Sequence, residues 1–369
     1  MTIALLLILA GAAISSLLSM LAAWRYLSVK PRPAAELPPI SILKPLSGLD
    51  RGLESNLRTF FEQEYPSFEI LFAVREASDP AAAIVHKLCG EYATVSARLL
   101  IAGEPEYANA KAYSLERMLA GAANDLLVMS DSDTRVTKGM LRTIAAEFAN
   151  PRVGVATCPY RAVAGPSFWS KLEAIGMNTD FIGGILTARM LEGMRFAVGP
   201  TIAARRGVLE SIGGFKRLSQ YLAEDFVMGQ FAADAGHGVI LSSYVIEHHI
   251  ETSDFRHNAA HRLRWMRSTR RSRPLGYIGQ FFTMPLPLAL MACAIEPRLW
   301  PAAVGLTAIR LVAAFVVSWG VLRARVHWLL LPIEDLLTFC FWIAGFFGNT
   351  IEWRGERFRL LADGRFKRV

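Results

Sequence analysis

Long apolar stretches open the amino-acid sequence and recur in its last third. The first, residues 3–24, is long enough to span a bilayer as a single helix. Pro285 and Pro287 predict a kink in the second stretch. We therefore expect an N-terminal transmembrane anchor at residues 1–30 and a cluster of transmembrane helices at residues 274–350. The later stretches are residues 275–295, 299–319 and 328–347.

Between the membrane stretches, short apolar runs alternate with helical stripes. Residues 68–74 and 126–129 have the length and composition of buried strands, and the apolar positions of residues 53–61 share one helix face. Residues 168–190 are helical and unusually apolar, which suits either the membrane surface or the core. This alternation predicts a mostly parallel, doubly wound α/β sheet. Further strands are expected at residues 40–43, 98–101, 153–158, 196–204 and 239–246, and further helices after Asp79, around 111–119, at 140–148 and after Asp225.

Two carboxylates one residue apart, Asp131 and Asp133, end the central apolar run. In an α/β sheet, ligands bind at the carboxyl ends of the central strands. Buried neighbouring carboxylates repel each other unless a cation lies between them. Oxygen ligands suit Mg²⁺ or Mn²⁺, which usually share their coordination shell with substrate phosphates. The pattern indicates a metal–diphosphate site, and a solvated Asp-x-Asp turn is the alternative for this motif by itself.

Composition and charge point to a membrane protein. The hydrophobic content of 53% is high for a soluble protein, and the net charge is +8. Arginines cluster between Arg256 and Arg273, directly before an apolar stretch, which favours contact with anionic lipid head groups over nucleic acid. Arg25, Lys30 and Arg32 follow the first stretch. The positive-inside rule then places residues 31–273 in the cytoplasm, which we expect to be that of a bacterium, at the inner membrane.

The membrane topology stays open at this level. Arg310 lies inside one apolar stretch, and Glu334 and Asp335 lie inside the next, so a pair between them would compensate the buried charge. Four crossings would leave the basic tail at residues 351–369 outside, against the positive-inside rule. One stretch is therefore re-entrant or interfacial.

Acidic motifs precede an arginine–tryptophan motif along one α/β domain. In this order they resemble the D, D, D, (Q/R)xxRW signature of membrane-bound inverting glycosyltransferases with the GT-A fold. The resemblance is closer to the ceramide glucosyltransferase family, which includes related bacterial hopanoid glycosyltransferases. It implies a GT-A-type (Rossmann-like) mixed sheet flanked by helices at residues 31–273. The motifs are residues 43–48, Glu76 with Asp79-Pro80-Ala81, Asp131 to Asp133, Tyr221-Leu222-Ala223-Glu224-Asp225-Phe226 and His261-Arg262-Leu263-Arg264-Trp265.

The resemblance also implies a role for each motif. Asp131 and Asp133 would hold Mg²⁺ or Mn²⁺ on the diphosphate of a UDP-sugar donor. Asp225 would be the base that deprotonates the acceptor hydroxyl, with Glu224 as the second choice. A helix-start acid at the helix dipole is the structural alternative for Asp225.

Other motif residues would bind the substrates. Glu76 or Asp79 would contact uracil or ribose, although Asp79 also suits a helix cap. Lys111 would touch phosphate unless it is a solvated helix-start lysine. The remaining expected contacts are a fork of Arg264 onto diphosphate, a stacking face on Trp265, and a hydrogen bond to phosphate from His261, which stands where the family has Gln or Arg.

The expected reaction is transfer of glucose from UDP-glucose to a membrane lipid such as ceramide. N-acetylglucosaminyl transfer to a hopanoid polyol is the nearest alternative, followed by processive polysaccharide synthesis. A non-catalytic membrane scaffold or a small transporter is the alternative of another class. Carboxylates at strand ends argue against a scaffold, which has no need of them.

Overall fold

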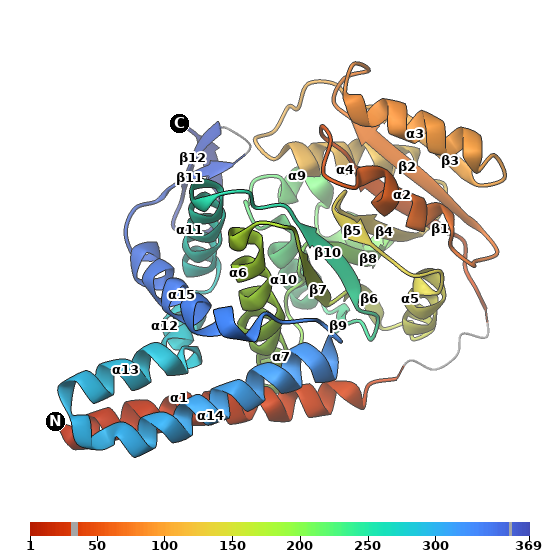
Figure 1. The fold of residues 1–369 in the computed structure, drawn as a ribbon. Coiled ribbons are helices and arrows are strands. Elements are labelled where there is room, and N and C mark those ends of the chain that lie inside the picture. Colours follow the sequence, from red (N-terminus) through yellow and green to blue (C-terminus); the bar gives the residue numbers. More distant parts are fainter. Residues whose placement is uncertain (31–35, 354–355) are drawn as a thin grey trace.

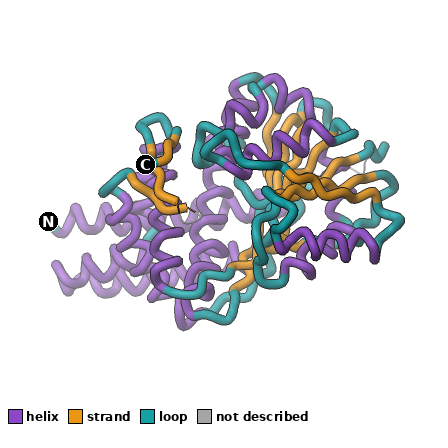
Figure 2. The backbone as a smooth tube through the Cα atoms, turned by 90° about the horizontal axis from the view of Figure 1, so that it is seen from above, coloured by secondary structure: helices purple, strands orange, loops and turns teal. Residues whose placement is uncertain are grey.

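A computed structural model describes residues 1–30, 36–353 and 356–369 (Figure 1). The described residues do not include residues 31–35, which contain Arg32 and begin a proline-rich stretch (residues 31–39) expected to be a linker, or residues 354–355 of the basic tail. Figure 2 shows the membrane helices gathered on one side of the molecule and the strands of the α/β domain on the other.

A seven-stranded mixed sheet forms the centre of the α/β domain, in the order β3-β2-β1-β4-β8-β6-β9. Only β8 runs against its neighbours in this sheet, because it is antiparallel to β4 and β6. The predicted parallel core is thus confirmed, with one reversed strand added. The strands are β1 (Ile40–Pro45), β2 (Phe68–Val74), β3 (Ser96–Ile101), β4 (Leu126–Ser130), β6 (Val153–Thr157), β8 (Thr201–Arg205) and β9 (Gly238–Leu241).

Helices cover both faces of this sheet, since alternate strand residues enter two separate cores. Ile70 and Phe72 of β2 enter one core, and Leu71 and Ala73 enter the other. The first face carries α2 (Leu53–Phe61), α3 (Pro80–Glu91) and α5 (Met140–Phe148), and the second carries α4 (Ala110–Gly121), α8 (Arg206–Ser211), α9 (Gly214–Leu218) and α10 (Glu224–Asp234).

Two predicted strands differ from the structure. The run at residues 239–246 is split between β9 and β10 (Ile246–Ile250), which belong to different sheets. The run at residues 196–204 becomes a strand only from Thr201, because Pro200 has no N–H for the ladder. The strand β10 pairs with β5 (Thr134–Arg135) and β7 (Tyr160–Ala164) in a small second sheet.

One long helical segment joins the α/β domain to the membrane helices. It consists of α6 (Phe168–Gly176), the π-helical turn η1 (Met177–Phe181) and α7 (Ile182–Glu192). The Asn178 side chain exchanges two hydrogen bonds with the Ala162 backbone of β7. Farther along, α7 packs on α1 (Thr2–Leu27). The interpretation of residues 168–190 as core helix is therefore confirmed for their buried side chains, and a position at the membrane surface stays a prediction.

Among the described residues, three helical segments are long and apolar enough to cross a membrane, and a bent pair would make a fourth. The bend between the paired helices is 64° and lies just before Pro285, as the proline pair predicts. The bent pair comprises α12 (Pro274–Gly279) with η2 (Gln280–Thr283), and α13 (Pro285–Ile295). The long segments are α1, then η3 (Pro297–Leu299) with α14 (Trp300–Phe315) and η4 (Val316–Val321), then η5 (Trp328–Leu330) with α15 (Leu331–Gly345).

Contacts at both ends of the helix cluster show how its segments connect to the rest of the chain. The Thr2 hydroxyl donates to Glu296 (3.5 Å), so the turn between α13 and α14 lies beside the N-terminus (Figure 1). These two helices therefore run to that end and back. The chain after α15 rejoins the α/β domain, where Phe366 N donates to Gln220 O (3.1 Å). The segment after α15 thus lies against the α/β domain.

The basic tail folds into a three-stranded sheet that packs on the loop before α10. Its strands are β11 (Thr350–Trp353), β12 (Glu356–Leu360) and β13 (Phe366–Arg368). Phe366, Phe358 and Ile351 form a small core with Leu222, three residues before Asp225. The sequence analysis predicts no such sheet.

Phe366→Ala should lower kcat without weakening donor binding. The lost ring leaves a void under Leu222, and such core truncations cost about 3–5 kcal/mol. The loop that leads into Asp225 then loses its support, whereas the side chains at the end of β4 keep theirs. Turnover and UDP affinity measured on the same preparation test this, with the exposed Val369→Ala as control. Equal losses in both quantities would contradict it.

Candidate active site

Buried Lys44 holds the turn that carries Asp131 and Asp133 at the end of β4. Its ammonium group donates to Asp131 O (2.5 Å) and Thr134 Oγ1 (3.1 Å), and lies 3.7 Å from the centre of the Phe60 ring. Burial lowers the Lys44 pKa to about 7, although the charges of Asp131 and Asp133 oppose this. A side chain of the neighbouring strand β1 thus holds this turn in place.

Lys111 joins two of the predicted acidic motifs. Its Nζ lies 2.7 Å from Asp131 Oδ1 and 3.4 Å from Glu224 Oε1. Asn109 caps α4 and also donates to Glu224 Oε2 (3.1 Å). Burial opposes the charged form of Lys111, but the neighbouring carboxylates outweigh it and raise its pKa. Lys111 is therefore a paired cation of the cluster and not a solvated helix-start lysine.

Asp225 lies in the first turn of α10, next to this cluster. A Cβ on Gly199 would come within 2.8 Å of Asp225 Oδ2, so only glycine leaves room for the carboxyl group there. Burial, followed by the charge of Glu224, raises the Asp225 pKa to about 7. A carboxyl group with that pKa exchanges protons near neutral pH, which suits a general base.

Asp133 faces a histidine from the small second sheet. His248 Nε2 lies 3.1 Å from Asp133 Oδ2, and His249 N donates to Asp133 O (2.8 Å). Burial disfavours the charged ring, but Asp133 outweighs it and raises the His248 pKa. The second carboxylate oxygen, Asp133 Oδ1, is buried and has no hydrogen-bond partner.

That buried Oδ1 could coordinate a cation, so Asp131 and Asp133 fit a site for a divalent cation. Within the described residues, no three His, Cys, Asp or Glu side chains converge on one metal position. A cation at this turn would therefore take further ligands from substrate phosphates, as Mg²⁺ and Mn²⁺ commonly do.

Asp79 and Glu76, the two carboxylates expected to contact uracil or ribose, have different surroundings. Asp79 caps α3 by accepting from Ala81 N (2.9 Å), and it also accepts from Gly48 N at 3.0 Å. Glu76 is exposed beyond the end of β2. The cap predicted for Asp79 is confirmed, and its bond to Gly48 fixes the loop after β1.

The arginine–tryptophan motif lies on α11 (Phe255–Ser272). His261 Nδ1 donates to Glu173 Oε1 (2.7 Å), which leaves Nε2 of the neutral ring as an acceptor. The expected hydrogen bond from His261 to phosphate therefore requires the protonated ring and stays a prediction. The Trp265 ring lies 4.2 Å from the His261 ring, while the Arg264 guanidinium lies 6.0 Å from the Trp353 ring of β11.

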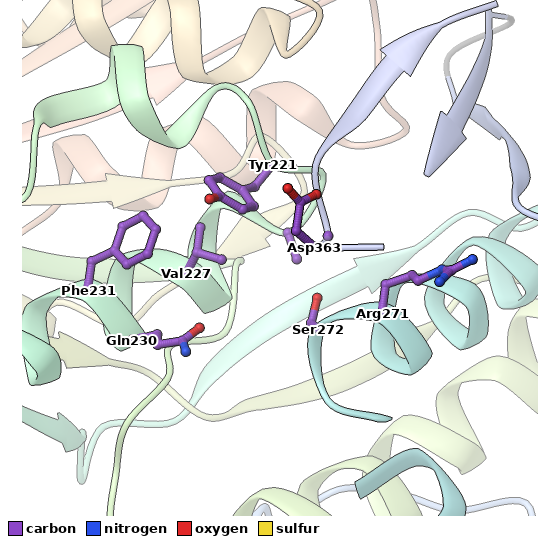
Figure 3. Close-up of a pocket in the computed structure, with 9 residues that line it drawn as sticks. Tyr221, Val227, Gln230, Phe231, Arg271, Ser272 and Asp363 are labelled. Carbon is purple, nitrogen blue, oxygen red and sulfur yellow. The ribbon is translucent and has the colours of Figure 1, made fainter. Parts of the chain in front are cut away.

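A cavity of about 240 Å³ lies behind the Tyr221–Phe226 motif (Figure 3). Tyr221 and Phe231 line it from the α10 side, and Asp363 and Arg271 line it from the tail and α11. The carboxylates of Asp131, Glu224 and Asp225 do not line this cavity. The cavity therefore lies between the tail and α10 and is distinct from the site of these carboxylates.

Comparison with known proteins assigns the chain. The sequence profile described as Glycosyl transferase family 21 matches residues 4–366. The chain belongs to glycosyl transferase family 21.

Curated relatives of this family 21 chain include ceramide glucosyltransferases. Ceramide glucosyltransferase 1 of Caenorhabditis elegans is 28% identical over 217 residues, which cover 58% of the chain and 46% of the relative. Ceramide glucosyltransferase of Komagataella phaffii is 31% identical over 106 residues, which cover 28% and 21%. The matches thus span less than half the length of these relatives.

A solved structure confirms the GT-A fold of the family 21 chain. The mannosyltransferase PcManGT from Pyrobaculum calidifontis, in complex with GDP-Man and Mn²⁺, superposes with a TM-score of 0.56. The identity is 21%, and the match covers 94% of the chain and 97% of the mannosyltransferase. The predicted GT-A mixed sheet is therefore confirmed, and the described residues of this family 21 chain also include candidate membrane-spanning helices.

Sequence reasoning missed several residues of the family 21 site. Lys44 lies in the motif at residues 43–48, and Asn109 lies two residues before Lys111. Nothing in the local sequence marks Lys44 as a contact of Asp131 or Asn109 as a contact of Glu224. His248 reaches Asp133 only through the pairing of β10 with β5. The adjacent pair His248–His249, in a strand bounded by isoleucines, was the available signal for a polar site.

Proposed function

We propose that the protein transfers glucose from UDP-glucose, with inversion, to a hydroxyl group of a membrane lipid such as ceramide. Membership of family 21 and the ceramide glucosyltransferase relatives support the reaction class. The observation that carries the proposal is the placement of Asp225 beside the ion-paired Lys111, Asp131 and Glu224.

In this mechanism, Asp131 and Asp133 would hold Mg²⁺ or Mn²⁺, which neutralises the negative charge of the diphosphate when it is bound. Lys111 adds a second positive charge to the same position. Asp225 takes the proton of the acceptor hydroxyl while the oxygen of that hydroxyl bonds to the anomeric carbon of the sugar. The bond between that carbon and the diphosphate oxygen breaks at the opposite face, so UDP leaves and the configuration inverts.

The proposed membrane arrangement brings the water-soluble donor and the lipid acceptor to the same domain. We propose that residues 1–30 anchor a cytoplasmic catalytic domain at residues 31–273, where UDP-sugars dissolve. Residues 274–350 return to the same face and residues 351–369 cover the domain. The arginine-rich α11 then faces anionic lipid head groups at the inner membrane of a bacterium.

Activity should depend on the protonation of Asp225. The base acts only when ionised, so kcat/KM should rise with pH up to about pH 7 and level off above it. Initial rates between pH 5 and pH 9 at low substrate concentration measure this limb. A profile without an ionisation near pH 7 would speak against Asp225 as the base.

Product identification tests the reaction. Purified protein is incubated with labelled UDP-glucose or UDP-N-acetylglucosamine and a lipid extract or pure ceramide, and the product is identified by mass. Glucosylceramide supports the proposal. N-acetylglucosaminyl hopanoid or a sugar polymer would support the corresponding alternative, and release of no UDP with any donor would leave a scaffold or transporter.

A further inference from the structure

A buried arginine in the membrane cluster reaches the α/β domain through η1. Arg310 of α14 lies 2.7 Å from Asp335 of α15 and 2.9 Å from Asp180 of η1. The predicted pairing of Arg310 is thus found with Asp335, while Glu334 pairs with Arg262 at 2.7 Å. The two carboxylates around Arg310 differ in access, because the Asp335 side chain is 3% exposed and that of Asp180 is 21% exposed.

Aromatic rings continue from Asp180 towards the acidic cluster. Phe181, the next residue of η1, is 41% exposed and lies 5.7 Å from the Tyr160 ring and 6.3 Å from the Trp265 ring. Tyr160 in turn lies 5.2 Å from the His248 ring, which contacts Asp133. A chain of contacts therefore leads from the membrane helix α14 to the end of β4.

We propose that Asp180 and Phe181 bind the polar part of the lipid acceptor. Asp180 accepts a hydrogen bond from an amide N–H or a second hydroxyl of the lipid, and Phe181 with Trp265 covers the adjoining carbon chain. This inference rests on the proposed function and assigns the acceptor class: lipids with a hydrogen-bond donor beside the reacting hydroxyl.

Charge balance supports a ligand at Asp180. Arg310 donates two hydrogen bonds to Asp335 and one to Asp180, so one guanidinium is shared between two carboxylates, and Asp180 is the more exposed of the two. A donor from the ligand would compensate the charge of Asp180 at the membrane boundary. The π-helical turn itself agrees with this, since such turns occur frequently at functional sites.

Replacement of Asp180 should change acceptor choice selectively. With the full-length protein in phosphatidylcholine vesicles, ceramide is compared with hexadecanol, which has a reacting hydroxyl but no second donor. Asp180→Ala should raise the KM for ceramide about 10-fold, the loss expected for one charged hydrogen bond. The KM values for hexadecanol and UDP-glucose should stay within about two-fold of wild type.

Asp234→Ala is the control, because it removes a half-exposed carboxylate that pairs with another arginine, Arg195. It should leave the ratio of the two acceptor KM values unchanged. Phe181→Leu provides a second variant that leaves every ion pair intact, and it should weaken both acceptors several-fold without changing the KM for UDP-glucose.

Equal effects of Asp180→Ala and Asp234→Ala on the acceptor ratio, or no effect of Asp180→Ala and Phe181→Leu on acceptor KM, would overturn the inference while the proposed function stands. A wild-type protein that glucosylates neither acceptor would overturn both.

Discussion

Asp225→Asn should abolish sugar transfer while the protein still binds UDP-glucose and metal. The amide has the shape of the carboxyl group and fits beside Gly199, but it cannot take a proton from the acceptor. Loss of a general base lowers the rate about 10²–10⁴-fold, so kcat should be lower than that of wild type by about this factor. Initial rates, together with calorimetric titration of UDP and Mn²⁺, separate chemistry from binding.

A matched control for this variant lies on the same helix. Asp234 ends α10, is half-exposed and pairs with Arg195, so Asp234→Asn should leave turnover unchanged. Glu224 is the weaker candidate for the base, because Lys111 and Asn109 already hold its two oxygens. Turnover of Asp225→Asn at the wild-type rate would remove Asp225 from the role and leave Glu224 to be tested.

Asp131→Ala should lose donor binding and transfer together. The substitution removes one proposed metal ligand and leaves Lys111 without its closest carboxylate. Truncating one partner of such a pair costs about 2–5 kcal/mol, so the Kd of UDP in the presence of Mn²⁺ should rise about 30-fold or more. The same calorimetric titration, repeated without metal, measures how much of the affinity depends on the cation.

Asp125 offers the control at the opposite end of β4, where its side chain is 96% exposed. Asp125→Ala keeps the strand and removes a carboxylate far from the turn, so it should bind UDP like wild type. Metal-dependent UDP binding of wild-type strength in Asp131→Ala would exclude Asp131 as a metal ligand.

Local patterns were sufficient for most of the fold. The apolar runs at residues 68–74 and 126–129 became β2 and β4, and the stripe at residues 140–148 became α5, because each segment buries its own apolar side chains. The reversed strand β8 carries the same kind of apolar run as its parallel neighbours, so its direction had no local signal.

Contacts between distant segments limited the prediction of the site. The motifs placed Asp131, Glu224 and Lys111 in one site, and the structure brings their side chains together. No spacing in the sequence relates Lys44 to Asp131 or His248 to Asp133, since these contacts depend on strand register. In the tail, Phe358 and Leu360 alternate with charged residues, and this period-two pattern was a usable signal for β12.

The packing of β13 on the loop before α10 has a practical consequence for recombinant work. Val369 follows β13 directly, so a purification tag fused there would begin next to the strand that supports Leu222. A preparation tagged at that end and found inactive would say little about the enzyme, whereas a cleavable tag ahead of Met1 leaves this contact undisturbed.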